Sequence, residues 1–331
     1  MNFAKKLLYN LPLSEKLEKL FLWGHSKPWN DYSSFCMRKY GFRVQKISVN
    51  AGFSCPNRDG SVGIGGCSYC SNISFSPFYC HHDTNIAGQI KDGILFFEKK
   101  YKAMRFVAYF QTYTNTYASL DILRQTYLQA LVHEKIVGLV ISTRPDCLSR
   151  EIFTLLAEIG KKTEVQLEIG IESTLDHSLK RVNRGHTFED AKNAIFMAQE
   201  FDIPVGVHII LGLPGESRQD ILGHATTISK LPVNSIKLHQ LQVLKDTPIV
   251  SDFLKNGGDF MHFSIEEYIE LSIDFLEVLN PELIVERFIS ESPPDLIISP
   301  KWNKIKNFEF VAKLEKRMKE RNTWQGRLFG K

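Results

Sequence analysis

The chain has 331 residues, of which 43% are hydrophobic and 24% are charged, and its formal net charge is +4. This composition excludes an intrinsically disordered chain and is sufficient for a large folded core. No apolar run approaches the roughly 20 residues that span a bilayer, and residues 1–21 are too interrupted by charge and proline for a signal peptide. We therefore expect a cytoplasmic protein with no membrane partner.

Apolar, β-branched runs alternate along the chain with segments long enough for crossover helices. The expected strands are residues 44–50, 105–112, 136–143, 164–171, 204–212 and 235–243. The expected helices are residues 84–102, 118–133, 149–161, 187–201, 217–230 and 264–279. Continuous apolar strands that alternate with helices indicate a parallel sheet covered by helices.

The spacing of about 30 residues per unit is typical of βα repeats in a barrel. Because six units cannot close an eight-stranded barrel, we predict an α/β fold with a partial, open (β/α)6 TIM-like barrel over residues 44–245. Residues 1–43 are expected to form an N-terminal arm. Residues 246–331 form an expected C-terminal extension, in which LIVERFIS could add a strand. A doubly wound sheet is the alternative, although no GxGxxG motif follows the first strand.

Positive charge gathers in the C-terminal tail. Residues 301–331 contain ten Lys or Arg and three Asp or Glu, and the segment looks helical. A solvated amphipathic helix and a polyanion-binding surface are both consistent with this pattern. The tail also contains aromatic rings that could stack on bases, namely Trp302, Phe308, Phe310 and Trp324. RNA is therefore a candidate partner.

Three of the six cysteines form a C-x11-C-x2-C motif directly after the first expected strand: Cys55, Cys67 and Cys70. Without a secretory signal, clustered cysteines are ligands or catalysts more often than disulfides. Three thiols in a glycine-rich loop favour an iron–sulfur cluster with one open iron. A zinc site completed by Cys80 or one of the two histidines after it is an alternative, and so is a redox disulfide between two of the thiols.

Polar residues follow the expected strands, as in SVNAGFSC, YFQTYTNTY, ISTRPDC and EIGIES. Catalytic groups of parallel barrels lie at the carboxyl ends of the strands. We therefore expect these segments to form one functional rim.

The cysteine motif, the aromatic Tyr69 before the last cysteine and the glycine-rich GVHIILGLPGES resemble the radical S-adenosylmethionine (radical SAM) superfamily over residues 44–243. The stretches STRPDCL, LEIGIESTLDHSLKRVNRGH and HIILGLPGES are similar to the branch with the Elongator catalytic subunit and oxygen-independent coproporphyrinogen dehydrogenase. CPNRDG, FQTYTNTYA and SESPPDLIISPKW resemble bacterial radical SAM proteins related to the Elongator branch.

This resemblance implies that Cys55, Cys67 and Cys70 bind three irons of a [4Fe-4S] cluster, and that the fourth iron takes the amino and carboxylate groups of S-adenosylmethionine. It further implies a reductant such as flavodoxin or ferredoxin. One electron then cleaves the sulfonium bond and yields a 5′-deoxyadenosyl radical, which abstracts hydrogen from the substrate.

The resemblance also implies contacts to S-adenosylmethionine. Tyr69 is expected against the adenine, Glu168 at the methionine amino group or ribose, and Ser142 and Arg144 near the ribose and carboxylate. The apolar wall and the closure of the pocket are expected from Ile209, Gly212, Leu238 and Gln240.

Two features depart from the common superfamily pattern. The gap of 11 residues lengthens the usual C-x3-C-x2-C motif, and FQTYTNTY stands where many members have a Gly-Gly-Glu run. Gln111, Thr112 and Tyr113 are therefore the expected substitutes for that contact. Cys147 and His239 are the candidate catalytic residues, each with an ordinary alternative as a buried thiol and a hydrogen-bonded core histidine.

The segment 181–184, which contains two arginines, is either a solvated helix end or a phosphate-directed group beside the site. The expected function is a radical SAM enzyme that modifies RNA, with tRNA and its wobble uridine suggested by the Elongator branch. The chain leaves no room for that branch's acetyltransferase domain, so acetyl transfer is not expected. The alternatives are a radical SAM enzyme acting on a small metabolite or porphyrin, and a non-enzymatic zinc-stabilised RNA-binding protein.

Overall fold

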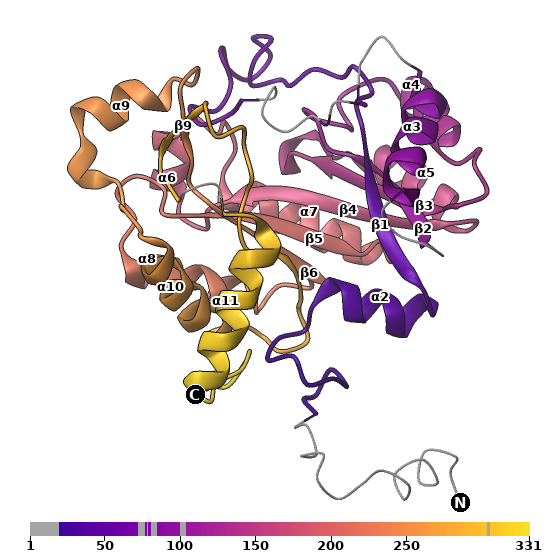
Figure 1. Ribbon diagram of the computed structural model, residues 1–331. Helices are drawn as coiled ribbons and strands as arrows, with labels where there is room; N and C mark the ends of the chain where they lie inside the picture. Colours follow the sequence, from indigo (N-terminus) through magenta and orange to yellow (C-terminus); the bar gives the residue numbers. More distant parts are fainter. Residues whose placement is uncertain (1–19, 72–76, 78, 81–84, 100–103, 303–304) are drawn as a thin grey trace, which may run out of the picture.

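The computed structural model describes residues 20–71, 77, 79–80, 85–99, 104–302 and 305–331. Its main feature is a curved sheet of seven parallel strands in the order β1-β2-β3-β4-β5-β6-β8 (Figure 1). The strands are β1 (Arg43–Val49), β2 (Met104–Phe110), β3 (Ile136–Thr143), β4 (Glu164–Glu172), β5 (Val205–Leu211), β6 (Ser235–Gln240) and β8 (Ile284–Arg287).

The strand order decides between the two predicted folds. The strands of this sheet follow one another in chain order, with β7 left out, whereas a doubly wound sheet reverses its order at a switch point. The sheet ends at β1 and β8, which are not neighbours, so the barrel is open. The partial, open TIM-like barrel is therefore confirmed. Strand β8 lies in the LIVERFIS segment and adds a seventh strand to the six expected units.

The period-two alternation of β4 illustrates how the strands build two environments. Val165, Leu167 and Ile169 are buried in the main hydrophobic core, where the sheet packs against its outer helices. Residues of the opposite parity, such as Glu168 and Gly170, face the inside of the barrel. Every strand thus carries an apolar outer face and a mixed inner face.

All six helices predicted between the strands and after β6 are present. They are α3 (Ile86–Glu98), α4 (Leu120–Ala130), α5 (Arg150–Gly160), α7 (Phe188–Glu200), α8 (Arg218–Ile228) and α10 (Ile265–Val278). The sequence defines several of their starts, because Thr187, Ser217 and Ser264 each form a capping box with an acidic residue three positions later. The helices not foreseen are α2 (Tyr32–Tyr40), α6 (Asp176–Arg181) and α9 (Ile249–Lys255).

The described part of the N-terminal arm packs against the barrel. Asp31 caps α2, with its side chain accepting from the backbone of Ser34, and forms a parallel bridge with Val285 of β8. Cys36 of α2 is buried against Val44 of β1 and its neighbours. This cysteine therefore contributes to the packing of α2 on the sheet.

The C-terminal tail contains α11 (Asn307–Glu320), which lies beside α10 (Figure 1). Arg321, just after α11, donates to Glu270 at 2.7 Å and to Asp274 at 2.8 Å, both on α10. Trp302 and Phe310 are buried in the main core. The expectation that these two rings are free to stack on bases is therefore wrong.

A short two-stranded sheet completes this region, formed by β7 (Val243–Leu244) and antiparallel β9 (Ile297–Ser299). Among the helices of the described ranges, none combines the length and apolarity needed to cross a bilayer.

We expect Phe310→Leu to lower the free energy of unfolding by about 1–2 kcal/mol, because Phe310 is fully buried and its loss leaves a partly filled cavity. Phe308→Leu is the matched control on the same helix: its ring is 71% exposed, and the change should stay within about 0.5 kcal/mol. Urea unfolding measures both. Equal losses in the two variants would show that α11 does not dock as described.

Candidate active site

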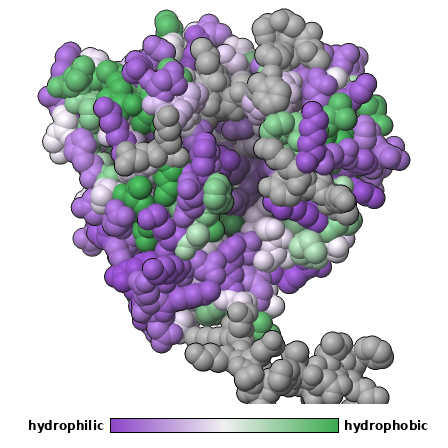
Figure 2. Space-filling model, viewed as in Figure 1, coloured by the Kyte–Doolittle hydropathy of each residue, from purple (hydrophilic) through white to green (hydrophobic). Residues whose placement is uncertain are grey.

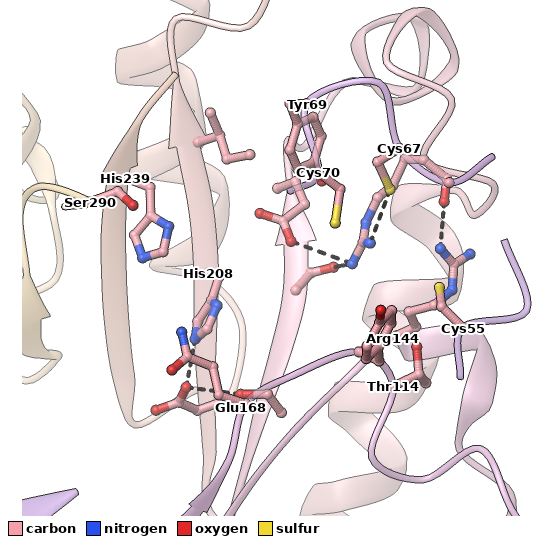
Figure 3. A pocket seen from close by; sticks show the side chains of 18 of the residues that line it. Cys55, Cys67, Tyr69, Cys70, Thr114, Arg144, Glu168, His208, His239 and Ser290 are labelled. Carbon is pink, nitrogen blue, oxygen red and sulfur yellow. Dashed lines mark hydrogen bonds and ion pairs between the residues drawn. The ribbon is translucent and has the colours of Figure 1, made fainter. Parts of the chain in front are cut away.

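The carboxyl ends of the barrel strands and the loops after them line one cavity, which we call the central cavity. This face of the molecule is mostly hydrophilic and is hollowed near its middle (Figure 2). Cys55, Cys67 and Cys70 all line the central cavity. They lie on one side of it, whereas Glu168 and His239 lie on the other (Figure 3).

The loop that carries the cysteines folds back on itself and is fastened to the barrel. Within it, Arg58 N donates to Cys55 O at 2.8 Å, and Cys70 N donates to Cys67 O at 3.0 Å. Ser68 N donates to Val182 O at 2.9 Å, which ties the loop to the end of α6. Backbone hydrogen bonds thus fix the conformation of the cysteine motif and its position on the barrel.

Glycines in this region make room for a buried side chain. A Cβ at Gly63 would lie 2.3 Å from Asn57 Oδ1, and a Cβ at Gly185 would lie 2.8 Å from the same atom. Asn57 is fully buried and its Nδ2 donates to Asn183 O at 2.6 Å. These two glycines therefore serve the packing of Asn57 between the loop and the barrel.

Arg184 is buried and lines the central cavity, so the interpretation as a solvated helix end is wrong for this residue. Its Nη2 donates to Gly170 O at 2.6 Å and lies 3.4 Å from the carboxylate of Glu172. Arg144 Nη1 donates to the carbonyl of Arg184 at 2.7 Å. The two guanidinium groups thereby connect β3, β4 and the segment after α6.

Glu168 lies at the base of the cavity in a cluster of buried charges, which we call the interior ion cluster: Lys46, Glu168, Lys237 and Glu286. Lys46 bonds to both glutamates, and Lys237 Nζ donates to Glu168 Oε2 at 2.7 Å. Burial opposes the charged carboxylate, but the two lysines and His208 hold the pKa of Glu168 well below its ordinary value. Burial also lowers the pKa of Lys237 to about 8, against the attraction of Glu168.

The carboxylate of Glu168, which was expected to contact the methionine amino group or the ribose, already accepts from several protein donors. Besides the two lysines, Ser142 Oγ donates to its carboxylate at 3.2 Å, and His208 Nε2 lies 2.7 Å from it. A further donor, such as an amino group, would have to displace one of these partners.

Two histidines lie next to each other on the inner face of the barrel. His208 of β5 and His239 of β6 have ring centroids 5.6 Å apart. Burial lowers the pKa of His239 well below its ordinary value, so this imidazole is neutral. Its Nε2 is buried and has no hydrogen-bond partner among the described residues. His239 can therefore offer a polar atom to a molecule in the central cavity.

Most of the predicted cofactor contacts line the same cavity as the cysteines. These residues are Tyr69, Gln111, Tyr113, Ser142, Arg144, Glu168 and Gln240, together with the catalytic candidate His239. The apolar contribution comes from a cluster in which Tyr69 and Leu241 pack against Ile210.

Three of the predicted contacts do not line the central cavity, two because the side chains of a strand alternate and one because it packs against a ring. Ile209 and Leu238 are fully buried in the outer core against the helices, whereas Ile210 and His239 face the cavity. Gly212 has φ +87° and packs against the ring of Phe263, since a Cβ there would lie 3.0 Å from it. The glycine thus makes room for an aromatic ring of the protein.

Thr112 and Cys147 also do not line the central cavity. Thr112 is buried, and Cys147 is half-buried in the short 3-10 helix η2 (Pro145–Cys147). Burial raises the pKa of the Cys147 thiol to about 12, which keeps it neutral. This environment favours the interpretation of Cys147 as an ordinary thiol.

Cys80, the cysteine that could complete a zinc site, does not lie with the other three thiols. Cys80 is buried in the main core, and its thiol donates to Gln89 Oε1 at 3.2 Å. His81 and His82 lie outside the described residues. Within the described ranges, no three His, Cys, Asp or Glu side chains are grouped closely enough to hold a single metal ion.

Comparison with protein families identifies the barrel. Residues 54–228, more than half of the chain, match the family model of the Radical SAM superfamily, and residues 233–320 match that of the Radical_SAM C-terminal domain. The chain belongs to the radical SAM superfamily. It is therefore an enzyme of a superfamily whose members use a [4Fe-4S] cluster and S-adenosylmethionine.

Individual radical SAM relatives extend over different shares of the chain. The YtqA protein of Bacillus subtilis (strain 168) is 34% identical over 290 residues, which cover 88% of this chain and 89% of that protein. The tRNA uridine(34) acetyltransferase of Methanocaldococcus infernus is 27% identical over 165 residues, which cover 49% of this chain but 30% of that protein. The expected relation to the Elongator branch is thus confirmed as a distant one.

A solved structure shows the same fold. The archaeal Methanocaldococcus infernus Elp3 with an N-terminal deletion superposes with a TM-score of 0.64 at 18% identity, covering 85% of this chain and 64% of that one.

The residues around the central cavity fit both groups that the superfamily implies. The three thiols line one cavity, and each would bind a different iron, so they need not approach one another as ligands of a single ion do. Buried polar atoms without a protein partner in the described structure include Tyr69 OH, Arg184 Nε and His239 Nε2. Such atoms at a cavity suit a polar ligand such as S-adenosylmethionine.

Proposed function

We propose that this radical SAM enzyme holds a [4Fe-4S] cluster on Cys55, Cys67 and Cys70, binds S-adenosylmethionine in the central cavity and modifies RNA. The observation that carries the cofactor assignment is that the three thiols line the same cavity as Tyr69 and Arg144. When bound, the cluster and S-adenosylmethionine supply a one-electron cleavage that generates a 5′-deoxyadenosyl radical for hydrogen abstraction.

The residues of the chain bind and orient S-adenosylmethionine in this proposal. Tyr69, Ile210 and Leu241 form the apolar surface for the adenine. Arg144 Nε and Nη2 donate to the two carboxylate oxygens of Asp146 at 2.9 and 2.8 Å. The guanidinium is therefore already oriented before a carboxylate of the cofactor binds near it. Gln240 is fixed by its two hydrogen bonds with the backbone of Ser290 and closes the cavity on the side of β6.

The residues on the opposite side of the cavity face the substrate in this proposal. His239, neutral and with a free buried Nε2, accepts or donates one hydrogen bond according to its tautomer. Reduction needs an external donor such as flavodoxin or ferredoxin, and we place the enzyme in the cytoplasm with it.

RNA as the substrate is supported by the relation to the tRNA uridine(34) acetyltransferase, and a uridine of tRNA is the substrate that this relation suggests. A small-molecule substrate is the second candidate. It is favoured by one observation, the burial of Trp302 and Phe310, which removes two of the rings that could stack on bases.

Mass spectrometry of tRNA nucleosides separates the two candidates. We expect a deletion strain to lack one modified nucleoside that is restored by the wild-type gene and by Cys80→Ala, but not by Cys67→Ala. Cys80 lies in the core and away from the central cavity, so its variant controls for the loss of a buried thiol. A nucleoside profile that is unchanged by the deletion would reject tRNA and favour the small molecule.

A further inference from the structure

The sulfur of Cys67 lies close to two nitrogen donors of buried side chains. Arg184 Nη1 lies 3.5 Å from Cys67 Sγ, and Asn57 Nδ2 lies 3.6 Å from it (Figure 3 shows the cysteine and its dashed contact). Both distances lie in the range of N–H···S hydrogen bonds. One buried thiol thus receives one cationic and one neutral donor.

Neither donor is free to turn away from the sulfur. The second amino group of the Arg184 guanidinium is held by Gly170 O at 2.6 Å and by Glu172 at 3.4 Å. A Cβ at position 170 would lie 2.7 Å from this group, so the glycine allows the arginine to approach the strand. Asn57 is fixed in turn by Asn183 O at 2.6 Å. The donors are therefore preorganised by the barrel.

The physical consequence concerns the electron that the cluster accepts. Reduction adds one negative charge, which spreads over the cluster and its cysteine sulfurs. Hydrogen bonds to these sulfurs and a buried positive charge beside them stabilise the reduced state more than the oxidised state. Both donors therefore raise the reduction potential and make the cluster easier to reduce.

We propose that Arg184 and Asn57 are positioning residues that hold the Cys67 thiolate and set the reduction potential of the cluster. The inference rests on the proposed function, because it presupposes that Cys67 is a ligand. Electron balance is simple: an external reductant gives one electron, and the cluster takes it up without a bond being made or broken.

The test is a redox titration of the anaerobically reconstituted full-length protein, followed by electron paramagnetic resonance. We expect Arg184→Met to lower the equilibrium constant for one-electron reduction at least tenfold, which corresponds to a fall in potential of about 59 mV. Glu172→Gln is the matched control, since it removes the counter-charge of Arg184 but not the contact to sulfur. Its potential should stay equal or rise.

Iron content and circular dichroism are measured for each variant, so that potentials are compared between loaded, folded proteins. If Arg184→Met does not retain iron, Arg184→Lys is the deciding variant. Lysine keeps the positive charge, but its single nitrogen cannot contact both Gly170 O and the sulfur as the two terminal nitrogens of arginine do. It should still lower the equilibrium constant about threefold. Asn57→Asp, which replaces the neutral donor by an anion, should lower it as well.

Equilibrium constants for reduction within twofold of wild type in loaded Arg184→Met, or in Arg184→Lys where that variant decides, would overturn the inference. The proposed function would remain intact. A wild-type protein that binds no iron would instead overturn the proposed function. The two failures are therefore distinguishable in one series of measurements.

Discussion

Cys67→Ala is expected to abolish binding of the iron–sulfur cluster. A cluster with one open iron depends on three thiolates, and the variant leaves two. Cys67 is also the thiol on which Arg184 and Asn57 converge. After anaerobic reconstitution, wild-type protein should be brown and bleach with dithionite, whereas Cys67→Ala should be colourless and contain little iron or sulfide.

Cys80→Ala is the control for this experiment, because Cys80 is equally buried but lies in the core, where its thiol contacts Gln89 of α3. It should keep its colour and its iron. If Cys67→Ala retained the full iron content, or if wild type bound zinc and stayed colourless, the assignment of the three cysteines to a cluster would be wrong.

Glu168→Gln is expected to lower the free energy of unfolding by about 3–5 kcal/mol, because the change removes the nearer of the two anions beside the buried Lys237 and leaves Lys46 with Glu286 alone. Glu158→Gln is the matched control. Glu158 also pairs with a cation, Arg124 at 2.7 Å, but both side chains are 48% exposed, so little change is expected. Urea unfolding at neutral pH compares the two variants.

The pH dependence of this difference follows from the depressed pKa of Glu168. A carboxyl group with a lower pKa in the folded state contributes stability that is complete above its unfolded value, near 4.5, and is lost as the pH falls. Between about pH 5 and neutral pH the gap between wild type and Glu168→Gln should therefore be constant, and it should shrink in acid. A gap that widens in acid would show that Glu168 is not held as an anion.

The sequence was sufficient for the architecture because the relevant signals are local. Continuous apolar runs such as IVGLVIST predict the strands, and capping residues such as Ser217 predict where helices begin. The unforeseen helix α2 has no strong apolar periodicity of its own. It is stabilised by contacts with β1, which follows it directly, and with β8, which lies far from it in sequence and at the other edge of the sheet from β1.

The site was predictable where a motif fixes a residue and unpredictable where the register of a strand decides. Cys55, Cys67 and Cys70 follow from their spacing, and Tyr69 follows from its place among them. Ile209 was expected on the cavity wall, but a shift of one residue exchanges the two faces of a strand, so Ile210 lies there.

Partners that are distant in sequence were missed for a different reason. Lys46 and Glu168 are separated by 122 residues, and Lys237 and Glu168 by 69. Nothing in the local pattern relates them, and only the curvature of the sheet brings the inner faces of their strands together. The sequence marks Arg184 as part of a basic segment at 181–184, but it does not predict that the side chain is buried. The burial depends on Gly170 of β4, whose missing Cβ makes room for the guanidinium.

The docking of α11 has a consequence for any polyanion that meets this face. Arg317, Arg321 and Arg327 already have carboxylate partners on α10. A phosphate could use them only by breaking these pairs, so few ions would be displaced from the nucleic acid per contact made here. Affinity for tRNA through this face would consequently change little with ionic strength, despite the formal charge of the segment.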